Sequence, residues 1–587
     1  MEAVSSWKPA FAALVAVLLG LTGCAAVSSA SAHTSTTAPT TTGTAPPSST
    51  TTTTAGPGTS SLTVEPAIEA RLTDNFNPFD TTSVLGQMGV PSFVYEPLIE
   101  FNELQVDQYY PWLAESWSFS TSGQTIIFNL RPGVTWVDGS TFSAADVAYT
   151  FNLVKANPGL GYGLPIVSAV ATNPMTFTLT LSQPGYALLY NIARVPIVKN
   201  GYAGSVAPRR YLDTRPDGTG PYYLARRADA SPKRIVLTAR PRYWQSGEPA
   251  IDQLVFPAFS STSAILSALR TGAIDWAGNF MPDVAANYVG KDQKDNHFWA
   301  PPVDCISLEL NLSRFPLDRL AVRKAVSAAL DRDAISKATE GGYALPATSS
   351  TGLVVPTDSQ YLTAATTGDI RGTADPGLVE HLMQDAGYHR DGRGYWADRA
   401  GRELAFGIGA AAGSPLSAAA ALISAQLRAA GFDTEARAGP ARQLDAELRQ
   451  GDFDAAVLAS ATGPSPYYMY ENWLDPGLLV KGKAEGGNYV RLGPATDPAA
   501  AVATAAALDQ YTDYPSDSTE AARAIQALGH IVSDQLPVVP LMYGVAWAEF
   551  STRHASGWPN SQDAYEPATP VAPFAEYTVL QLDPASG

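Results

Sequence analysis

The alternation of strand-like and helix-like segments is the feature that most constrains the fold of this chain. Short runs rich in β-branched and aromatic residues, such as residues 126–130 and 176–181, predict strands. Segments with apolar residues three and four positions apart, such as 317–330 and 416–430, predict helices. Because both kinds of segment recur along the chain after Ser61, the sequence predicts α/β lobes and argues against a β-sandwich or a helical bundle.

Local signals place several further elements. Ser143 precedes a helical pattern and Asp146 follows three residues later, which predicts a helix N-terminus at Ser143. The apolar run 455–459 predicts another strand. The glycine-rich segment 407–413 superficially resembles a dinucleotide-binding loop, but its spacing is off by one and we expect a strand-to-helix turn there.

Length and charge bound the functional classes. A chain of 587 residues has room for about two to four folding units. It carries 38 Lys and Arg against 55 Asp and Glu, a formal net charge of −17, and shows no basic cluster. An acidic chain is repelled by phosphate backbones, so nucleic acid is not expected as a partner.

The N-terminus has the pattern of an export signal. Lys8 precedes an apolar run over residues 11–21, which is too short to span a bilayer. The following residues 21–24, Leu-Thr-Gly-Cys, resemble the lipobox of bacterial lipoproteins, which implies that Cys24 receives a lipid and anchors the protein to the membrane. The alternative is an ordinary cleaved signal in which Cys24 is incidental. Only Cys305 then remains in the body of the chain, so no internal disulfide is expected.

A catalytic or metal-binding constellation is not found in the sequence. No pair of histidines has H-x-x-x-H or H-E-x-x-H spacing, and no G-x-S-x-G motif occurs. Cys305 lies beside the apolar residues Ile306 and Leu308 and is expected to pack in a core strand. The sequence therefore predicts a protein that is not an enzyme and that carries no cofactor and no metal.

A series of short motifs extends over most of the chain. They are YEPL at 95–98, LAESW at 113–117, FNLRPGVTWVDG at 128–139, AADV at 144–147, GTGPY at 218–222, YW at 243–244, TGAID at 271–275, VRKAV at 322–326, ALDR at 329–332, DAGY at 385–388, GDFD at 451–454 and LPVVPL at 536–541. This ordered set resembles extracellular solute-binding protein family 5, the peptide- and nickel-type binding proteins of ABC importers.

The resemblance implies a fold and a division of the chain. The implied fold is α/β, a large type II periplasmic-binding-protein-like fold of two lobes joined by a hinge, with an extra inserted subdomain. The implied segments are a lipoprotein signal peptide (1–24), a Thr/Ser/Pro-rich disordered tether (25–61), lobe I (62–300, with the inserted subdomain at about 86–205), lobe II (301–544) and a C-terminal return to lobe I (545–587).

Two stretches are expected to supply a ligand site, since a binding protein needs a concave, largely apolar cleft with a few placed polar groups. After Asp275 the sequence resembles the family loop that enters the cleft, which makes Asn279 and Phe280 candidate contacts. The loop after strand 455–459 adds the candidates Thr462, Tyr467, Tyr468, Tyr470 and Trp473. Plain packing within a lobe remains the alternative for the aromatic cluster at 467–473.

The same loop differs from that of peptide-binding relatives. In those relatives it carries an aspartate that holds the α-amino group of the ligand, whereas this chain has no acid between Asp454 and Glu471. An ordinary free peptide is therefore not the expected ligand, unless another acid such as Asp74, Asp304 or Glu471 takes that role.

The function implied by these features is solute capture outside the cytoplasm. We expect a monomer in the cell envelope, anchored through lipidated Cys24, that delivers a peptide-like or other small organic molecule to the permease subunits of an ABC importer. Two alternatives stay open at this point. One is a non-transport envelope lipoprotein of the same fold with a sensing or regulatory role, and the other is a secreted hydrolase.

Overall fold

The computed structural model describes residues 59–65, 71–570 and 575–585, which form two compact units. The continuous unit is Ala300–Ala546, and the discontinuous unit combines the described residues up to Trp299 with those from Trp547 onward. The sequence predicts the corresponding breaks after residues 300 and 544. The signal peptide with Cys24 and nearly all of the tether lie outside the described residues.

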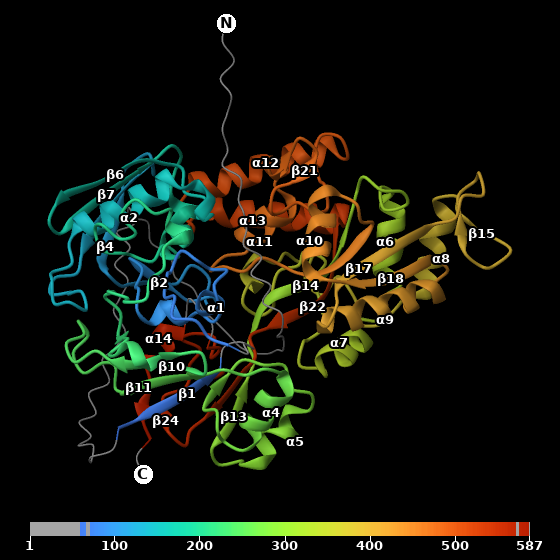
Figure 1. The fold of residues 1–587 in the computed structure, drawn as a ribbon. Helices are drawn as coiled ribbons and strands as arrows, with labels where there is room; N and C mark the ends of the chain where they lie inside the picture. The colour runs from blue at the N-terminus through green and yellow to red at the C-terminus, as the bar shows by residue number, and fades with distance from the viewer. Residues whose placement is uncertain (1–58, 66–70, 571–574, 586–587) are drawn as a thin grey trace, which may run out of the picture. The chain divides into compact units, whose positions relative to one another are not determined.

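An eight-stranded sheet forms the centre of the discontinuous unit (Figure 1). Its central strand β1 pairs in parallel with β11 on one side and with β12 on the other, and β12 pairs antiparallel with β23. In sheet order the strands are β13 (Asn296–Trp299), β23 (Ala548–Ser551), β12 (Trp276–Ala277), β1 (Ser61–Glu65), β11 (Gln253–Pro257), β10 (Arg234–Ala239) and β8 (Tyr222–Tyr223), with β9 (Ala230–Ser231) paired to β10.

The discontinuous unit also contains a separate four-stranded antiparallel sheet. Its strands are β4 (Ala114–Phe119), β5 (Thr125–Leu130), β7 (Thr176–Leu181) and β6 (Ile166–Asn173), in that order. Alternate residues of β5 and β7 are buried, and helix α2 (Ala144–Ala156) packs on the sheet. The predicted strands 126–130 and 176–181 are confirmed by β5 and β7. The predicted helix start at Ser143 is confirmed as well, because α2 begins at Ala144 and the backbone N–H of Ser143 donates to the Asp146 carboxylate at 2.9 Å.

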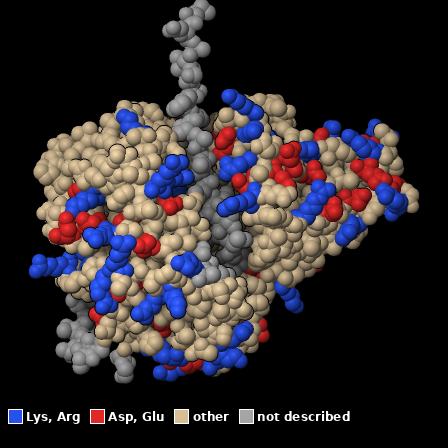
Figure 2. Space-filling model, in the orientation of Figure 1, with Lys and Arg blue, Asp and Glu red and all other residues tan. Residues whose placement is uncertain are grey.

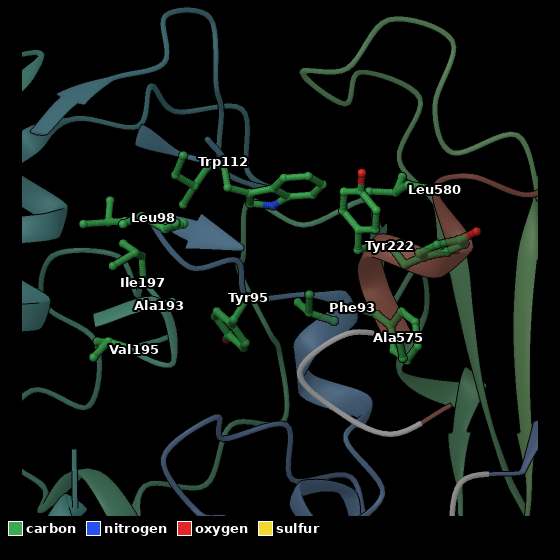
Figure 3. Packing of buried hydrophobic residues seen from close by; sticks show 14 of the residues in the cluster. Phe93, Tyr95, Leu98, Trp112, Ala193, Val195, Ile197, Tyr222, Ala575 and Leu580 are labelled. Carbon is green, nitrogen blue, oxygen red and sulfur yellow. The ribbon is translucent and has the colours of Figure 1, made fainter. Parts of the chain in front are cut away.

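The core of the discontinuous unit joins segments that are distant in the sequence. Figure 3 shows Ala575 and Leu580, from the C-terminal segment, packed beside Phe93 and Tyr222. The smaller elements here are β2 (Ile99–Phe101), β3 (Tyr109–Pro111), β24 (Ala555–Ser556), β25 (Asp583–Pro584), α1 (Val84–Gln87), α3 (Leu189–Ala193), α4 (Thr262–Arg270), α5 (Val284–Asn287) and α14 (Ala575–Val579).

A five-stranded sheet forms the centre of the continuous unit. Its order is β18 (Asp433–Gly439), β17 (Ala405–Ala411), β19 (Ala455–Ala459), β14 (Pro302–Leu310) and β22 (Val538–Val545). Strand β17 is parallel to β18 and β19, and helix α9 (Pro415–Ala429) packs against β17 and β18. Short pairs β15 (His389–Arg390) with β16 (Trp396–Ala397), and β20 (Leu479–Val480) with β21 (Lys483–Ala484), lie outside this sheet.

Seven further helices complete the continuous unit as described. They are α6 (Leu320–Ala328), α7 (Arg332–Glu340), α8 (Pro376–Asp385), α10 (Ala441–Gln450), α11 (Tyr467–Leu474), α12 (Pro498–Asp513) and α13 (Thr519–Gln535). The predicted strand 455–459 and the helix at 416–430 are confirmed by β19 and α9. The strand-to-helix turn expected over 407–413 begins only after Ala411, because β17 extends to that residue. The predicted helix 317–330 is wrong in its bounds, because the chain after Pro316 first makes a turn and α6 begins only at Leu320.

The surface in view in Figure 2 carries acidic and basic side chains close to one another. Ion pairs of the continuous unit include Arg390–Glu380 and Arg402–Asp398, each with a nitrogen–oxygen distance of 3.2 Å. Among the helices that the structure describes, none has the length and apolar character needed to cross a bilayer.

Candidate functional site

The carboxyl edge of the large sheet in the discontinuous unit brings together residues that are distant in the sequence. The parallel strands β1 and β12 end there, at Glu65 and Ala277, and Ala277 is paired with Glu549 of β23. In α/β sheets, ligands bind outside the carboxyl ends of the parallel strands. The predicted contacts Asn279 and Phe280 directly follow β12, so the structure places them at this edge.

Asn279 links two buried glutamates. Its backbone N–H donates to Oε2 of Glu549 at 3.0 Å, and its side-chain amide donates to Oε2 of Glu65. Both glutamates are 0% exposed, whereas Asn279 itself is half-buried. In the part of the chain that the structure describes, the second oxygen of each carboxyl, Oε1, has no hydrogen-bond partner. We call Glu65, Asn279 and Glu549 the carboxyl pair site.

Burial controls the protonation of the carboxyl pair site. Desolvation raises the pKa of Glu65 to about 7, against a smaller lowering by the hydrogen bond from Asn279. The pKa of Glu549 is raised to about 8, mainly by desolvation; the hydrogen bond from the Asn279 backbone lowers it by less, and the charge of Glu65 makes a smaller contribution to the rise. Both groups therefore titrate near neutral pH, which is where acids with a role in binding or proton exchange are expected to titrate.

Aromatic rings lie beside the carboxyl pair site. The rings of Phe280 and Trp547 meet edge to face with 5.2 Å between centroids, and Phe298 lies 4.8 Å from Trp547. Phe280 is half-buried, while Trp547 is buried. Tyr288 is buried as well, and the charge of Glu549 contributes to raising its pKa, after desolvation. This edge thus combines acceptor oxygens with aromatic surface, a combination typical of sites for small organic molecules.

The other predicted contacts belong to the continuous unit. Thr462 lies in the loop after β19 and is half-buried. The four aromatic candidates, which are all buried, lie on α11: Tyr467, Tyr468, Tyr470 and Trp473.

These aromatic side chains have partners within the continuous unit. Tyr467 stacks on Tyr511 with 4.5 Å between ring centroids, and the Tyr470 hydroxyl donates to the carbonyl of Thr351 at 3.1 Å. Trp473 packs so closely on Gly352 that a Cβ at that glycine would lie 2.6 Å from its ring. These contacts account for lobe packing, and contact with a ligand stays a prediction for Thr462 and for the four aromatic residues.

The acids considered from the sequence differ in their surroundings. Asp74 lies 3.4 Å from Arg227 at the surface, and Glu471 accepts a hydrogen bond from Tyr467 at 3.1 Å. Burial raises the pKa of Asp304, on β14, to about 7. Sequence reasoning missed Glu65 and Glu549. Glu549 is the one charged residue in the otherwise apolar run 545–550, a signal that could have identified it, whereas Glu65 ends a strand that also contains Ser61 and Thr63 and gives no such signal.

The described residues contain no group of three or more His, Cys, Asp or Glu placed to hold a metal ion. Cys305 is 0% exposed on β14, which confirms the prediction that it packs in a core strand. Burial raises the pKa of its thiol well above the usual value, so the reactive thiolate is disfavoured.

Comparison with solved structures defines the class of fold. A periplasmic oligopeptide-binding protein of an oligopeptide ABC transporter from Thermotoga maritima matches with a TM-score of 0.78, at 21% identity, over 89% of this chain and 99% of that chain. NikA from Brucella suis in complex with Fe(III)-EDTA matches with a TM-score of 0.72, at 21% identity, over 89% of this chain and 99% of that chain. The fold is the large two-lobe α/β fold of the periplasmic binding proteins, as predicted.

Sequence comparison defines the family. The model of bacterial extracellular solute-binding proteins, family 5 Middle, matches residues 108–478. The chain belongs to this family, and the resemblance inferred from its motifs is confirmed. The glutathione-binding protein GsiB of Escherichia coli K12 is 28% identical over 317 residues, which are 53% of this chain. The match covers 59% of the length of that relative, and 64% of the GsiB of Salmonella typhimurium, which is also 28% identical, over 56% of this chain.

Proposed function

We propose that this protein captures a small organic solute outside the cytoplasm and delivers it to the permease of an ABC importer. In this proposal it is a monomer, held at the membrane by a lipid on Cys24, and it does not change its ligand chemically. Membership of a solute-binding family supports the class of function. The observation that carries the proposal is the carboxyl pair site, where two buried carboxyls keep unpaired oxygens at the carboxyl edge of a sheet.

Unpaired buried oxygens have a cost that a ligand can relieve. A buried polar atom without a hydrogen bond destabilises a fold by about 1–3 kcal/mol, so folds keep few of them without a reason. A solute that donates to Glu65 and Glu549 would recover that free energy on binding. A binding protein can use such a site directly, whereas a hydrolase would need a nucleophile or an activated water beside it.

The proposal is tested by the solute that the protein carries from the cell. The protein is purified natively from the envelope, unfolded, and the released small molecules are identified by mass spectrometry. A released solute, added back at 100 times its Kd, should raise the free energy of unfolding by about 2.7 kcal/mol and should be recovered unchanged. Conversion of the solute on prolonged incubation would contradict the proposal and favour a secreted hydrolase.

The site is tested by a matched pair of asparagine variants. Asn279→Ala removes both the amide donor and the half-buried side chain at the carboxyl pair site. Asn287→Ala, on α5 of the same unit, removes a side chain whose amide donates, among the described residues, only to the carbonyl of Pro282. We expect the Kd of the returned solute to rise at least about tenfold, or about 1.4 kcal/mol, in the first variant only. Equal affinities in the two variants would place the binding site elsewhere.

A further inference from the structure

The carboxyl pair site lacks a positive charge of its own. Among the described residues, neither Glu65 nor Glu549 forms an ion pair with a lysine, an arginine or a histidine. The charged and titratable groups acting on the pair are the two glutamates themselves, with the Tyr288 hydroxyl near Glu549. Two buried carboxylates without a counter-charge are strongly disfavoured, so without a ligand the pair keeps protons at neutral pH.

Asn279 fixes the acceptor geometry of the pair. It occupies Oε2 of each glutamate and leaves Oε1 of each without a hydrogen-bond partner among the described residues, so the ionised pair offers two open acceptors. An ammonium or guanidinium group carries only donors, at least three of them, and no acceptor. A neutral hydroxyl has a single donor and can satisfy only one of the two oxygens. A neutral amide nitrogen can also donate to both oxygens but brings no positive charge, so the open acceptors and the missing counter-charge together favour a cationic nitrogen group.

Two further observations agree with a positively charged occupant. Phe280 and Trp547 place aromatic rings beside the site, and aromatic faces attract ammonium and guanidinium groups. The Tyr288 hydroxyl, which is buried and has no hydrogen-bond partner among the described residues, adds an unpaired polar group near Glu549. Aromatic rings together with unpaired buried oxygens form the usual surroundings of a bound organic cation.

We propose that the transported solute is an organic cation whose ammonium or guanidinium group binds between Glu65 and Glu549, beside Phe280. This inference rests on the proposed function and adds the chemical class of the solute. In this inference Glu65 and Glu549 replace the aspartate that is missing between Asp454 and Glu471. Both glutamates lie outside the family motifs.

Proton release follows from this mode of binding. The cation replaces the protons that the pair holds, so each carboxyl that ionises on binding releases one proton. For each proton released, the affinity rises about tenfold per pH unit while the free site is protonated. Because the pKa of Glu65 is about 7 and that of Glu549 about 8, affinity should increase from pH 6 to pH 8 and then level off.

The variants Glu65→Gln and Glu549→Gln imitate the protonated carboxyls and keep their shape. Glu566→Gln is the matched control, because Glu566 is also a fully buried glutamate of the discontinuous unit without a partner for either oxygen among the described residues. Melting of all three variants checks folding. The probes are agmatine with its uncharged urea analogue, L-arginine with L-citrulline, and an unblocked lysyl dipeptide with its fully acetylated form.

The expected result is that at least one cationic probe binds at least tenfold more tightly than its neutral partner, more tightly at pH 8 than at pH 6. Glu65→Gln and Glu549→Gln should each abolish that preference, and Glu566→Gln should keep it. The inference is overturned if the solute released from the native protein lacks a basic nitrogen, or if the charge preference survives in both site variants. Absence of any released solute and of binding by all probes would instead contradict the proposed function itself.

Discussion

Glu340, the last residue of α7, is predicted to make stability depend steeply on pH. It is 0% exposed, and within the described chain neither of its carboxyl oxygens has a hydrogen-bond partner. Desolvation raises the pKa of Glu340 to about 9, and the charge of Asp304 adds to the shift. Its position at a helix C-terminus, the negative end of the helix dipole, also disfavours the ionised form.

The direction of the effect follows from proton binding in the two states. The unfolded chain releases the proton of Glu340 above its ordinary value of about 4.5, whereas the folded chain keeps the proton up to about pH 9. The stability contributed by the protonated carboxyl is therefore complete below about pH 4.5 and is lost as the pH rises toward 9. From pH 5 to pH 7 the loss from this one group is about 2.5 kcal/mol.

The assay compares Glu340→Gln with wild type by urea unfolding at pH 5 and pH 7, with fluorescence followed for the continuous unit. Glutamine imitates the protonated acid at both pH values, so the variant should lose about 2.5 kcal/mol less than wild type between them. Glu435→Gln is the control, since that side chain is 71% exposed in an ion pair with Arg437. An unchanged pH dependence in Glu340→Gln would show that Glu340 is ionised, and therefore solvated or paired, in the folded protein.

Two further predictions concern the anchor and a backbone contact. Cys24→Ala should release the protein into the medium or leave it unprocessed, and unchanged membrane retention in cell fractionation would refute lipidation of Cys24. Gly218→Ala should lower the free energy of unfolding by about 1–3 kcal/mol, because a Cβ there would lie 1.8 Å from the carbonyl oxygen of Val94. Gly159→Ala is the control and should have little effect, because its Cβ would meet nothing within 4 Å. Equal thermal midpoints for the two variants would contradict the close approach of Gly218 to Val94.

Local signals predicted those parts of the fold that depend on local chemistry. The runs of β-branched and aromatic residues at 126–130 and 176–181 correctly predicted the strands β5 and β7, in which alternate residues are buried because the side-chain period of a strand is two. The acid three residues after Ser143 gave the start of α2. The helix at 317–330 failed at its beginning, because its apolar spacing extends into a turn after Pro316 that periodicity alone does not exclude.

The carboxyl pair site depends on pairing between distant segments and could be predicted only in part. Asn279 and Phe280 followed from the family loop, but Glu65 and Glu549 are separated by nearly the whole chain and meet because β12 pairs with both β1 and β23. A single sequence does not contain that pairing. It also does not show that both carboxyls lose contact with water, which decides their protonation and thus the chemistry of the site.

Stability and affinity are expected to respond to pH in opposite directions, and this separates the two roles of the buried acids. Without ligand, carboxyls such as Glu340, Glu65 and Glu549 destabilise the folded protein as the pH rises, since each must ionise in a buried position or keep a proton that the unfolded chain has released. A cationic solute provides a counter-charge to Glu65 and Glu549 only. The stabilisation by such a solute should therefore be larger at pH 8 than at pH 6, although the free protein is less stable at pH 8. A thermal-shift series at both pH values measures the two trends together, and a stabilisation that falls with pH would refute the binding of a cation at this pair.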